Sequence, residues 1–229
     1  MHQLLTIVRS SFLAVLLSLL TTAPLRAQTA PPFWKEIVAF KRLDSAQRAP
    51  GNPILFIGSS SFTRWAGLEQ SFSGYPVLNR AFGGSTLPDL IRYSYDIILP
   101  YRPRQVFVYC GENDLASSDS ISADEVLRRT ETLFNIIRTN LPDAQFCYVS
   151  IKPSPVRAAI QPKVREANRL IRKFIRRKKN AVFINIYDAM LDANGNMREE
   201  LYVADRLHMT AEGYTIWQGI LLPYLAARP

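Results

Sequence analysis

The sequence has few of the residues that usually bind transition metals. It contains two histidines and two cysteines among 229 residues, whereas a zinc site needs several imidazole, thiolate or carboxylate ligands. We therefore expect no metal. Asp188 and Asp192 could bind a cation, but we favour their interpretation as solvated carboxylates of a surface loop. Of the histidines, His2 lies in the N-terminal segment discussed below, which leaves His208 as the imidazole available for chemistry.

Two common enzyme signatures are also missing. No glycine-rich loop ends in Gly-Lys-Ser or Gly-Lys-Thr, which argues against a nucleotide phosphate site. The Gly-x-Ser-x-Gly elbow of the larger α/β-hydrolases is absent, because Phe62 stands where the second glycine belongs. Any serine chemistry in this chain must therefore use a different turn.

The apolar run near the N-terminus is too short to span a bilayer, which needs about 20 residues. Phe12–Leu20 follows Arg9 and precedes small residues up to Ala27. This pattern predicts an export signal over residues 1–27, with a membrane anchor as the alternative, and a single domain over residues 28–229. Since no cysteine near the cleavage region could carry a lipid, we expect a periplasmic or secreted protein with no membrane span after signal removal.

Acidic residues are fewer than basic ones, 19 against 28, which gives a net charge of +9. Removal of residues 1–27 takes away two arginines and no acid, so the net charge falls to about +7. Much of the surplus lies in Lys163–Lys179. Such a surplus could serve nucleic acid, anionic glycans or membrane surfaces, but a solvated helix face is the favoured interpretation. We expect no nucleic-acid partner for an exported protein.

The two cysteines, Cys110 and Cys147, belong to neighbouring predicted strands. An oxidising compartment would allow a disulfide. Strands that are adjacent in a parallel sheet seldom place two sulfurs in bonding geometry. We therefore expect buried free thiols, with a disulfide as the alternative.

Apolar runs alternate with amphipathic segments along the chain. The runs lack polar alternation, as in strands that are buried on both faces of a parallel sheet. Five repetitions of an apolar run and an amphipathic segment predict an α/β fold with helices on both faces of a five-stranded parallel sheet. The expected strands are Ile54–Ile57, Val77–Ala81, Val106–Cys110, Phe146–Ile151 and Val182–Ile186, and the expected helices are Phe33–Leu43, Pro88–Leu99, a segment from a Ser122/Glu125 capping box to Asn140, the basic segment, and Ala211–Leu222.

Small and polar residues follow three of the expected strands, at Gly58–Ser61, Gly83–Gly84 and Gly111–Asp114. Parallel α/β sheets place their sites beyond the carboxyl ends of the strands. Asp205 and His208 come shortly before the last helix. We therefore expect these four segments to meet at one edge of the sheet.

The residue types in these segments suit acyl transfer. A serine such as Ser60 becomes nucleophilic when a base takes its proton, and a carboxylate can orient that base. Asp205 lies three residues before His208, so both can face one cleft. A glycine N–H at Gly84 and the amide of Asn113 are suitable donors to an oxyanion. The alternative is that His208 has a structural role only, as a polar side chain whose hydrogen bonds are satisfied at the start of a helix.

Four blocks of sequence occur in order between about residues 54 and 217: Ile57–Trp65 (IGSSSFTRW), Asn79–Ser85 (NRAFGGS), Gly111–Asp114 (GEND) and Asp205–His208 (DRLH). Together they resemble the blocks of the SGNH hydrolases, also called GDSL-type esterases. The resemblance implies a three-layer α/β/α sandwich with a flavodoxin-like sheet. It implies no metal and no organic cofactor.

The same resemblance implies a role for each matching residue. Ser60 would be the nucleophile, His208 the general base and then acid, and Asp205 the group that orients it. The oxyanion hole would use the N–H groups of Ser60 and Gly84 and the side chain of Asn113.

Two departures from the family pattern affect the site. The usual Gly-Asp-Ser is replaced by Gly58-Ser59-Ser60, and Ser61 follows, so three serines compete as nucleophile; we favour Ser60. Arg206 follows Asp205 and could form an ion pair with it, which would weaken the hold of the carboxylate on His208.

The resulting hypothesis is a hydrolase of small O-acyl esters, with acetyl groups on carbohydrates or glycans as the expected substrate. One alternative is a glycan O-acetyltransferase that uses the same acyl-enzyme. Another is a non-catalytic glycan-binding module. Lys152–Pro155 (KPSP) follows a strand on the cleft side and could shape the substrate pocket or form a plain rigid loop. The sequence leaves the oligomeric state open.

Overall fold

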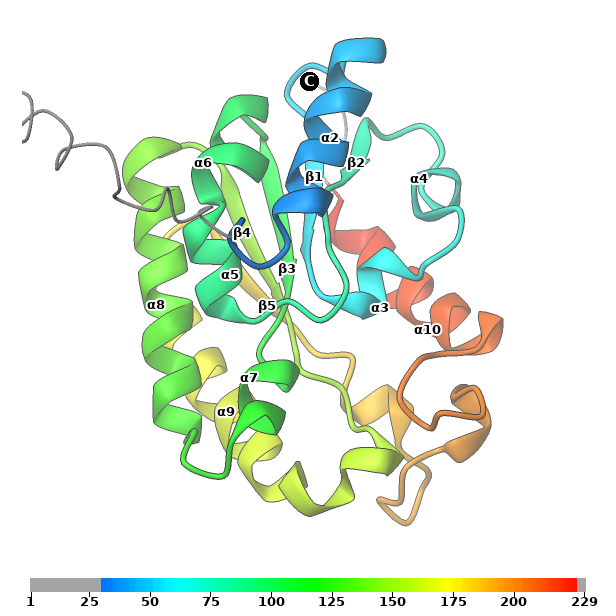
Figure 1. The fold of residues 1–229 in the computed structure, drawn as a ribbon. Helices are drawn as coiled ribbons and strands as arrows, with labels where there is room; N and C mark the ends of the chain where they lie inside the picture. Colours follow the sequence, from blue (N-terminus) through cyan, green and yellow to red (C-terminus); the bar gives the residue numbers. More distant parts are fainter. Residues whose placement is uncertain (1–29, 226–229) are drawn as a thin grey trace, which may run out of the picture. The chain divides into compact units, whose positions relative to one another are not determined.

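A five-stranded sheet positions the other elements of the fold (Figure 1). The computed structural model describes residues 30–225, so the predicted signal over residues 1–27 lies outside the described residues. All strand pairs are parallel, and the strand order is β2-β1-β3-β4-β5, the flavodoxin-like order. The α/β prediction is confirmed. The strands are β1 (Ile54–Gly58), β2 (Val77–Asn79), β3 (Gln105–Tyr109), β4 (Gln145–Val149) and β5 (Ala181–Ile184).

Helices lie between successive strands, as the crossover connections of a parallel sheet require. Within the described residues, no helix is both long and apolar enough to cross a bilayer. The helices are α2 (Trp34–Ala46), α3 (Ser60–Thr63), α4 (Leu68–Ser71), α5 (Leu87–Arg92), α6 (Ser94–Ile97), α7 (Glu112–Ser117), α8 (Ala123–Asn140), α9 (Gln161–Ile175) and α10 (Ala211–Leu221), with 3₁₀ turns at Leu99–Tyr101, Pro155–Ile160, Asp188–Met190, Glu199–Leu201 and Leu222–Tyr224.

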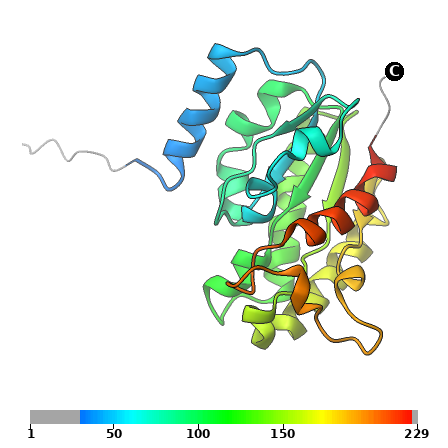
Figure 2. The same ribbon diagram turned by 90° about the vertical axis from the view of Figure 1, so that its right-hand side faces the viewer.

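The sheet separates two hydrophobic cores. In β1, Leu55 and Ile57 pack with residues of α5, α8 and α9, while Ile54 and Phe56 pack with residues of α3, α4 and α10. The views in Figures 1 and 2 show α8 and α10 on opposite sides of the sheet. Because both faces are covered, every residue of β1 and β3 is buried. This explains why these strands read as continuous apolar runs.

One predicted helix is wrong in its extent. The segment Pro88–Leu99 forms two short helices, α5 and α6, separated at Tyr93, whose φ of −98° and ψ of 10° are not helical. The buried Tyr93 ring packs against Phe82, and its hydroxyl donates to the carbonyl of Pro32. These tertiary contacts hold Tyr93 in a position that an uninterrupted helix would not provide.

Of the two hydrogen bonds in the capping box predicted at the start of α8, the structure confirms the one that Ser122 accepts. The Ser122 hydroxyl accepts from the amide of Glu125 at 3.1 Å. The Glu125 carboxylate instead pairs with Arg129 at 2.7 Å and also with Arg128. Local i,i+3 and i,i+4 ion pairs on the helix surface have therefore replaced the second half of the box.

Both cysteines are free and buried, as expected. Cys110 belongs to the core on the α5 and α8 side, while Cys147 belongs to the core on the α10 side. Burial raises the pKa of both thiols far above the usual range. The two sulfurs are therefore inert and face opposite sides of the sheet.

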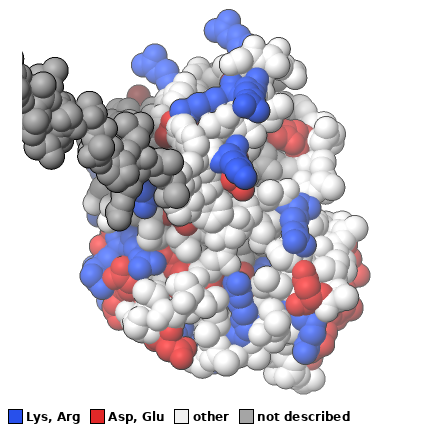
Figure 3. Space-filling model, viewed as in Figure 1, with Lys and Arg blue, Asp and Glu red and all other residues white. Residues whose placement is uncertain are grey.

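Most of the basic segment lies in α9, whose apolar side packs in the core while cations such as Arg165 and Arg172 are exposed. On the face drawn in Figure 3, Lys and Arg lie among uncharged surface and near Asp and Glu. The exposure of the cations on α9 agrees with a solvated helix face. The absence of a nucleic-acid partner stays a prediction.

Gly58, at the end of β1, is a position that no other residue can occupy without strain. Its φ is +137°, and a Cβ added there would lie 2.0 Å from the carbonyl oxygen of Tyr109. We expect Gly58→Ala to lower the free energy of unfolding by about 3 kcal/mol or more. Urea denaturation will measure the loss.

The matched control is Gly219→Ala in α10, where a Cβ would meet nothing within 4 Å. Alanine is favoured over glycine in a helix, so this variant should be equally or more stable than the wild type. Equal stability of the two variants would contradict the steric argument.

Candidate active site

Ser60 is lifted out of the sheet by the tight turn that ends β1. The amide of Ser59 donates to the Tyr109 carbonyl at 3.0 Å, and Ser60 then begins α3. Ser59 and Ser61 are only 4% and 3% exposed, while Ser60 is partly exposed. Of the three adjacent serines, Ser60 is the one that an incoming molecule can reach.

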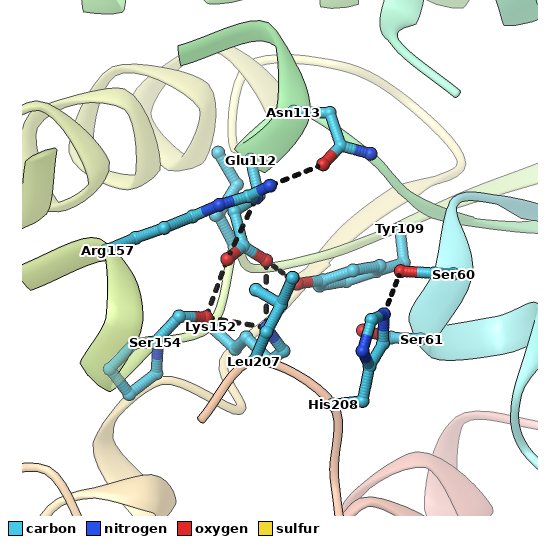
Figure 4. A network of polar contacts seen from close by, with 12 residues as sticks. Ser60, Ser61, Tyr109, Glu112, Asn113, Lys152, Ser154, Arg157, Leu207 and His208 are labelled. Carbon is cyan, nitrogen blue, oxygen red and sulfur yellow. Dashed lines mark hydrogen bonds and ion pairs between the residues drawn. The ribbon is translucent and has the colours of Figure 1, made fainter. Parts of the chain in front are cut away.

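Ser60, His208 and Asp205 form a chain of hydrogen bonds. His208 Nε2 lies 2.9 Å from Ser60 Oγ, and His208 Nδ1 lies 2.6 Å from Asp205 Oδ2. Figure 4 shows the His208 ring directed at the Ser60 hydroxyl. Two segments separated by 148 positions in the sequence are thus brought together, as predicted. With Nδ1–H donated to the carboxylate, Nε2 is free to accept the serine proton.

Asp205 is held by the backbone of its own loop. Its Oδ1 accepts from the amides of Leu207 at 2.9 Å and His208 at 2.8 Å. Partial desolvation acts to raise the pKa of Asp205, but the hydrogen bonds from the ring and the backbone amides outweigh it and hold the pKa well below its usual range. Asp205 is therefore ionised whenever it faces the imidazole at neutral pH.

Arg206 does not compete for Asp205. Its guanidinium pairs with Glu199 at 2.5 Å, and its backbone has a left-handed φ of 54°. The cation nearest to Asp205 is Arg64, at 3.8 Å and largely exposed. An exposed pair at this distance contributes little, so the carboxylate remains available to His208.

The segment that carries Gly84, one of the candidate oxyanion donors, lies beside Ser60. A Cβ built on Gly83 would lie 3.9 Å from Ser60 Cβ, and Gly84 follows with a φ of +83°. Asn113, on the first turn of α7, donates from Nδ2 to the Ser85 carbonyl at 3.0 Å. Gly84 and Asn113 therefore approach each other through Ser85, at the carboxyl ends of β2 and β3.

Glu112, the neighbour of Asn113, is a buried carboxylate, 4% exposed. Its Oε2 accepts from Tyr109 Oη at 2.8 Å and from Lys152 Nζ at 2.9 Å. Its Oε1 accepts from Ser154 Oγ at 2.6 Å and forms an ion pair with Arg157 Nη1 at 3.2 Å. Each carboxylate oxygen therefore has two polar partners (Figure 4).

Two cations stabilise the ionised form of Glu112. Burial alone would raise its pKa, but Lys152, Arg157 and the Ser154 hydroxyl outweigh burial and lower it. Lys152 is itself only 1% exposed and also donates to Ser154 Oγ at 2.6 Å. The Lys152–Glu112 pair is thus a buried ion pair whose charges are hydrogen-bonded.

This cluster was not assigned a role from the sequence. The residues Lys152–Pro155 are all buried, which favours the rigid-loop interpretation over an open pocket wall. A signal was nevertheless present, since Glu112 and Lys152 are opposite charges placed shortly after two apolar strands. The strand order makes these strands, β3 and β4, neighbours.

No group of three or more metal-ligating side chains occurs in residues 30–225. The Asp192 carboxylate accepts from the amides of Asn194 and Asn196 at 2.9 and 2.8 Å. Asp188 accepts from the Asn185 side chain at 2.5 Å. Local loop hydrogen bonds thus account for the two carboxylates that were considered for a cation.

A sequence model of the GDSL-like lipase/acylhydrolase family matches residues 46–216. The matched range includes all of the site residues described above. No curated protein shows a significant sequence match to this chain.

Solved structures share the fold at low sequence identity. A putative platelet activating factor from Streptococcus pneumoniae superposes with a TM-score of 0.73 at 21% identity, over 84% of this chain and 92% of that one. A GDSL-like lipase from Bacteroides thetaiotaomicron gives 0.72 at 19% identity, over 82% and 96%. An acetylxylan esterase from Geobacillus stearothermophilus gives 0.62 at 15% identity, over 79% and 97%.

We expect Lys152→Met to destabilise the protein strongly. The substitution keeps most of the side-chain volume but leaves the buried Glu112 carboxylate short of one cation, a change that costs about 3 kcal/mol. Urea denaturation will measure the free energy of unfolding.

Lys41→Met is the matched control. Lys41 pairs with Asp96 at 2.5 Å, but its side chain is 50% exposed, so the same substitution should cost no more than about 1 kcal/mol. Similar losses in the free energy of unfolding of the two variants would show that the buried pair contributes no more to stability than the exposed one.

Proposed function

This chain belongs to the GDSL-like lipase/acylhydrolase family and is an acyl ester hydrolase, and we propose that it cleaves small O-acyl esters with Ser60, His208 and Asp205 as its catalytic residues. The observation that carries the proposal is the chain of hydrogen bonds from Asp205 through His208 to Ser60, at 2.6 and 2.9 Å.

The acylation step follows from that geometry. Ser60 Oγ attacks the ester carbonyl carbon while His208 Nε2 takes the hydroxyl proton. Asp205 keeps the other ring nitrogen protonated and stabilises the imidazolium that forms. When the tetrahedral intermediate collapses, the alcohol oxygen leaves with the proton from His208, and the acyl group remains on Ser60.

Deacylation, the second half of the reaction, repeats the steps of acylation with water in place of the serine. His208 takes a proton from water, the hydroxyl attacks the acyl-enzyme, and the carboxylic acid is released as Ser60 recovers its proton. Both halves pass through an oxyanion.

Three donors would stabilise that oxyanion: the N–H groups of Ser60 and Gly84 and the Nδ2–H of Asn113. Within residues 30–225, no backbone carbonyl accepts from the Ser60 or Gly84 amide. Asn113 Nδ2 has two hydrogens and gives one to Ser85. The second hydrogen can therefore serve the oxyanion, at a typical value of about 3 kcal/mol for one donor.

We propose an acetyl group on a carbohydrate as the natural substrate. The connections from β1 to α3 and from β3 to α7 are short, which supports a small acyl group over a long one. A similar fold in an acetylxylan esterase is compatible with this assignment. The proposal also includes export, which depends on the predicted signal over residues 1–27.

Ser60→Ala and His208→Ala should each lower kcat on p-nitrophenyl acetate by at least about 10⁴-fold, because the nucleophile and its base act as one unit. Both variants should keep the wild-type melting temperature within a few degrees. Release of nitrophenol measures the rate.

Ser61→Ala is the matched control, since this neighbouring serine is buried and should keep activity within a few-fold of the wild type. The acetate ester should be preferred over the butyrate ester. Full activity in Ser60→Ala would rule out the mechanism. Transfer of a labelled acetyl group to a sugar, in place of release as acetate, would instead identify a glycan O-acetyltransferase.

The acid limb of the pH profile of kcat/KM should fit one ionisation and not two. The pKa of Asp205 lies well below its usual range, so this carboxylate stays charged as the pH falls from 7 to about 4. Its contribution is lost only at lower pH, as the pH passes through the lowered pKa. A limb with two ionisations above pH 4 would contradict the hydrogen bonding of Asp205.

A further inference from the structure

The Asn113 side chain is oriented by two contacts. Arg157 Nη2 donates to Asn113 Oδ1 at 3.1 Å, and Asn113 Nδ2 donates to the Ser85 carbonyl at 3.0 Å. A guanidinium has only donors, so the oxygen of the amide must face Arg157 and the nitrogen must face away from it. The amide therefore has one orientation, with its N–H groups on the side of Ser85, the residue that follows Gly84.

Arg157 is itself fixed by the buried cluster. Its Nη1 lies 3.2 Å from Glu112 Oε1, and its side chain is 22% exposed. The planar guanidinium thus holds the carboxylate with one nitrogen and the amide with the other, a fork that lysine could not reproduce. Figure 4 shows both contacts on the same guanidinium.

The electrostatics of the cluster also favour an anion nearby. Glu112 contributes one negative charge, while Lys152 and Arg157 contribute one positive charge each. The three groups together carry one surplus positive charge, and Arg157 is the one that contacts Asn113. A cation that binds an amide oxygen also makes the N–H of that amide a stronger donor.

The segment from Lys152 to Arg157 also contacts the loop that carries Asp205 and His208. The Tyr202 hydroxyl donates to the Pro153 carbonyl, and the Val156 amide donates to the Arg206 carbonyl at 3.2 Å. One segment is therefore bonded to both sides of the candidate site, the oxyanion side through Arg157 and the base side through Val156.

From these contacts we propose that Arg157 is a positioning residue for ester hydrolysis, which orients the Asn113 amide and strengthens its N–H as an oxyanion donor. This inference rests on the proposed function, in which Asn113 is such a donor. Arg157 acts through Asn113 and does not touch the reacting atoms.

The proposal predicts a loss in kcat with KM nearly unchanged, because the oxyanion exists only in the transition state. Arg157→Gln should lower kcat by about 10- to 30-fold, less than the loss of about 100-fold expected for Asn113→Ala, since the donor remains but is no longer fixed. Steady-state kinetics with p-nitrophenyl acetate give both constants.

A double-mutant cycle provides the decisive test. If Arg157 acts through Asn113, then Arg157→Gln in the Asn113→Ala background should lower kcat by less than about threefold. If the loss of kcat in the double variant equals the product of the losses in the two single variants, the proposal is overturned. A rise in KM at constant kcat would overturn it as well, because it would identify Arg157 as a substrate-binding group.

Two controls separate this inference from folding and from the proposed function. Arg198→Gln changes another partly buried arginine, 29% exposed and paired with Glu200 at 2.8 Å, and should leave kcat within twofold. Arg157→Lys keeps the charge beside Glu112 without the fork and should retain the wild-type melting temperature but still lose several-fold in kcat. Wild-type kcat in Arg157→Lys would overturn the orienting role.

Asn113→Ala alone tests the premise. If this variant keeps full kcat, the proposed oxyanion role of Asn113 fails. If it loses kcat while Arg157→Gln does not, the oxyanion role stands and only the inference about Arg157 fails.

Discussion

The arrangement of the site depends on the contacts of one buried group, the carboxylate of Glu112. It is buried, accepts one hydrogen bond from Tyr109 at the end of β3 and two from Lys152 and Ser154, which follow β4, and forms an ion pair with Arg157. An ionised group in this position is tolerated only when its charge is paired and its oxygens are satisfied. The loops after two neighbouring strands are therefore locked to each other at the edge of the sheet where the candidate catalytic residues lie.

The consequence for chemistry is rigidity on both sides of Ser60. On one side, Arg157 carries the constraint from Glu112 to the Asn113 amide. On the other, the backbone amides of Leu207 and His208 hold Asp205, which in turn fixes the imidazole. Donors that are already in place do not have to reorganise as charge develops on the ester oxygen. A hydrolase can gain its rate from such preorganisation without a metal ion.

Most of the fold could be predicted because a buried parallel sheet leaves a strong pattern. Five apolar runs predicted the five strands to within a few residues, since both faces of the sheet are covered and every residue of β1 and β3 is buried. The helix predicted over Pro88–Leu99 was wrong because Tyr93 is held by contacts with Phe82 and Pro32. Such contacts join residues that are distant in sequence, so helical periodicity alone does not contain them.

The sequence by itself determined the fold class, the family resemblance and the set of chemically competent groups, because these depend on residue types and their order. It also left a single histidine, His208, outside the N-terminal segment. Only the tertiary structure decided which of three serines faces that histidine, that Arg206 turns to Glu199, and that Arg157 joins Glu112 to Asn113. Those outcomes depend on where a side chain points once distant segments have packed, and packing geometry is a property of the whole domain.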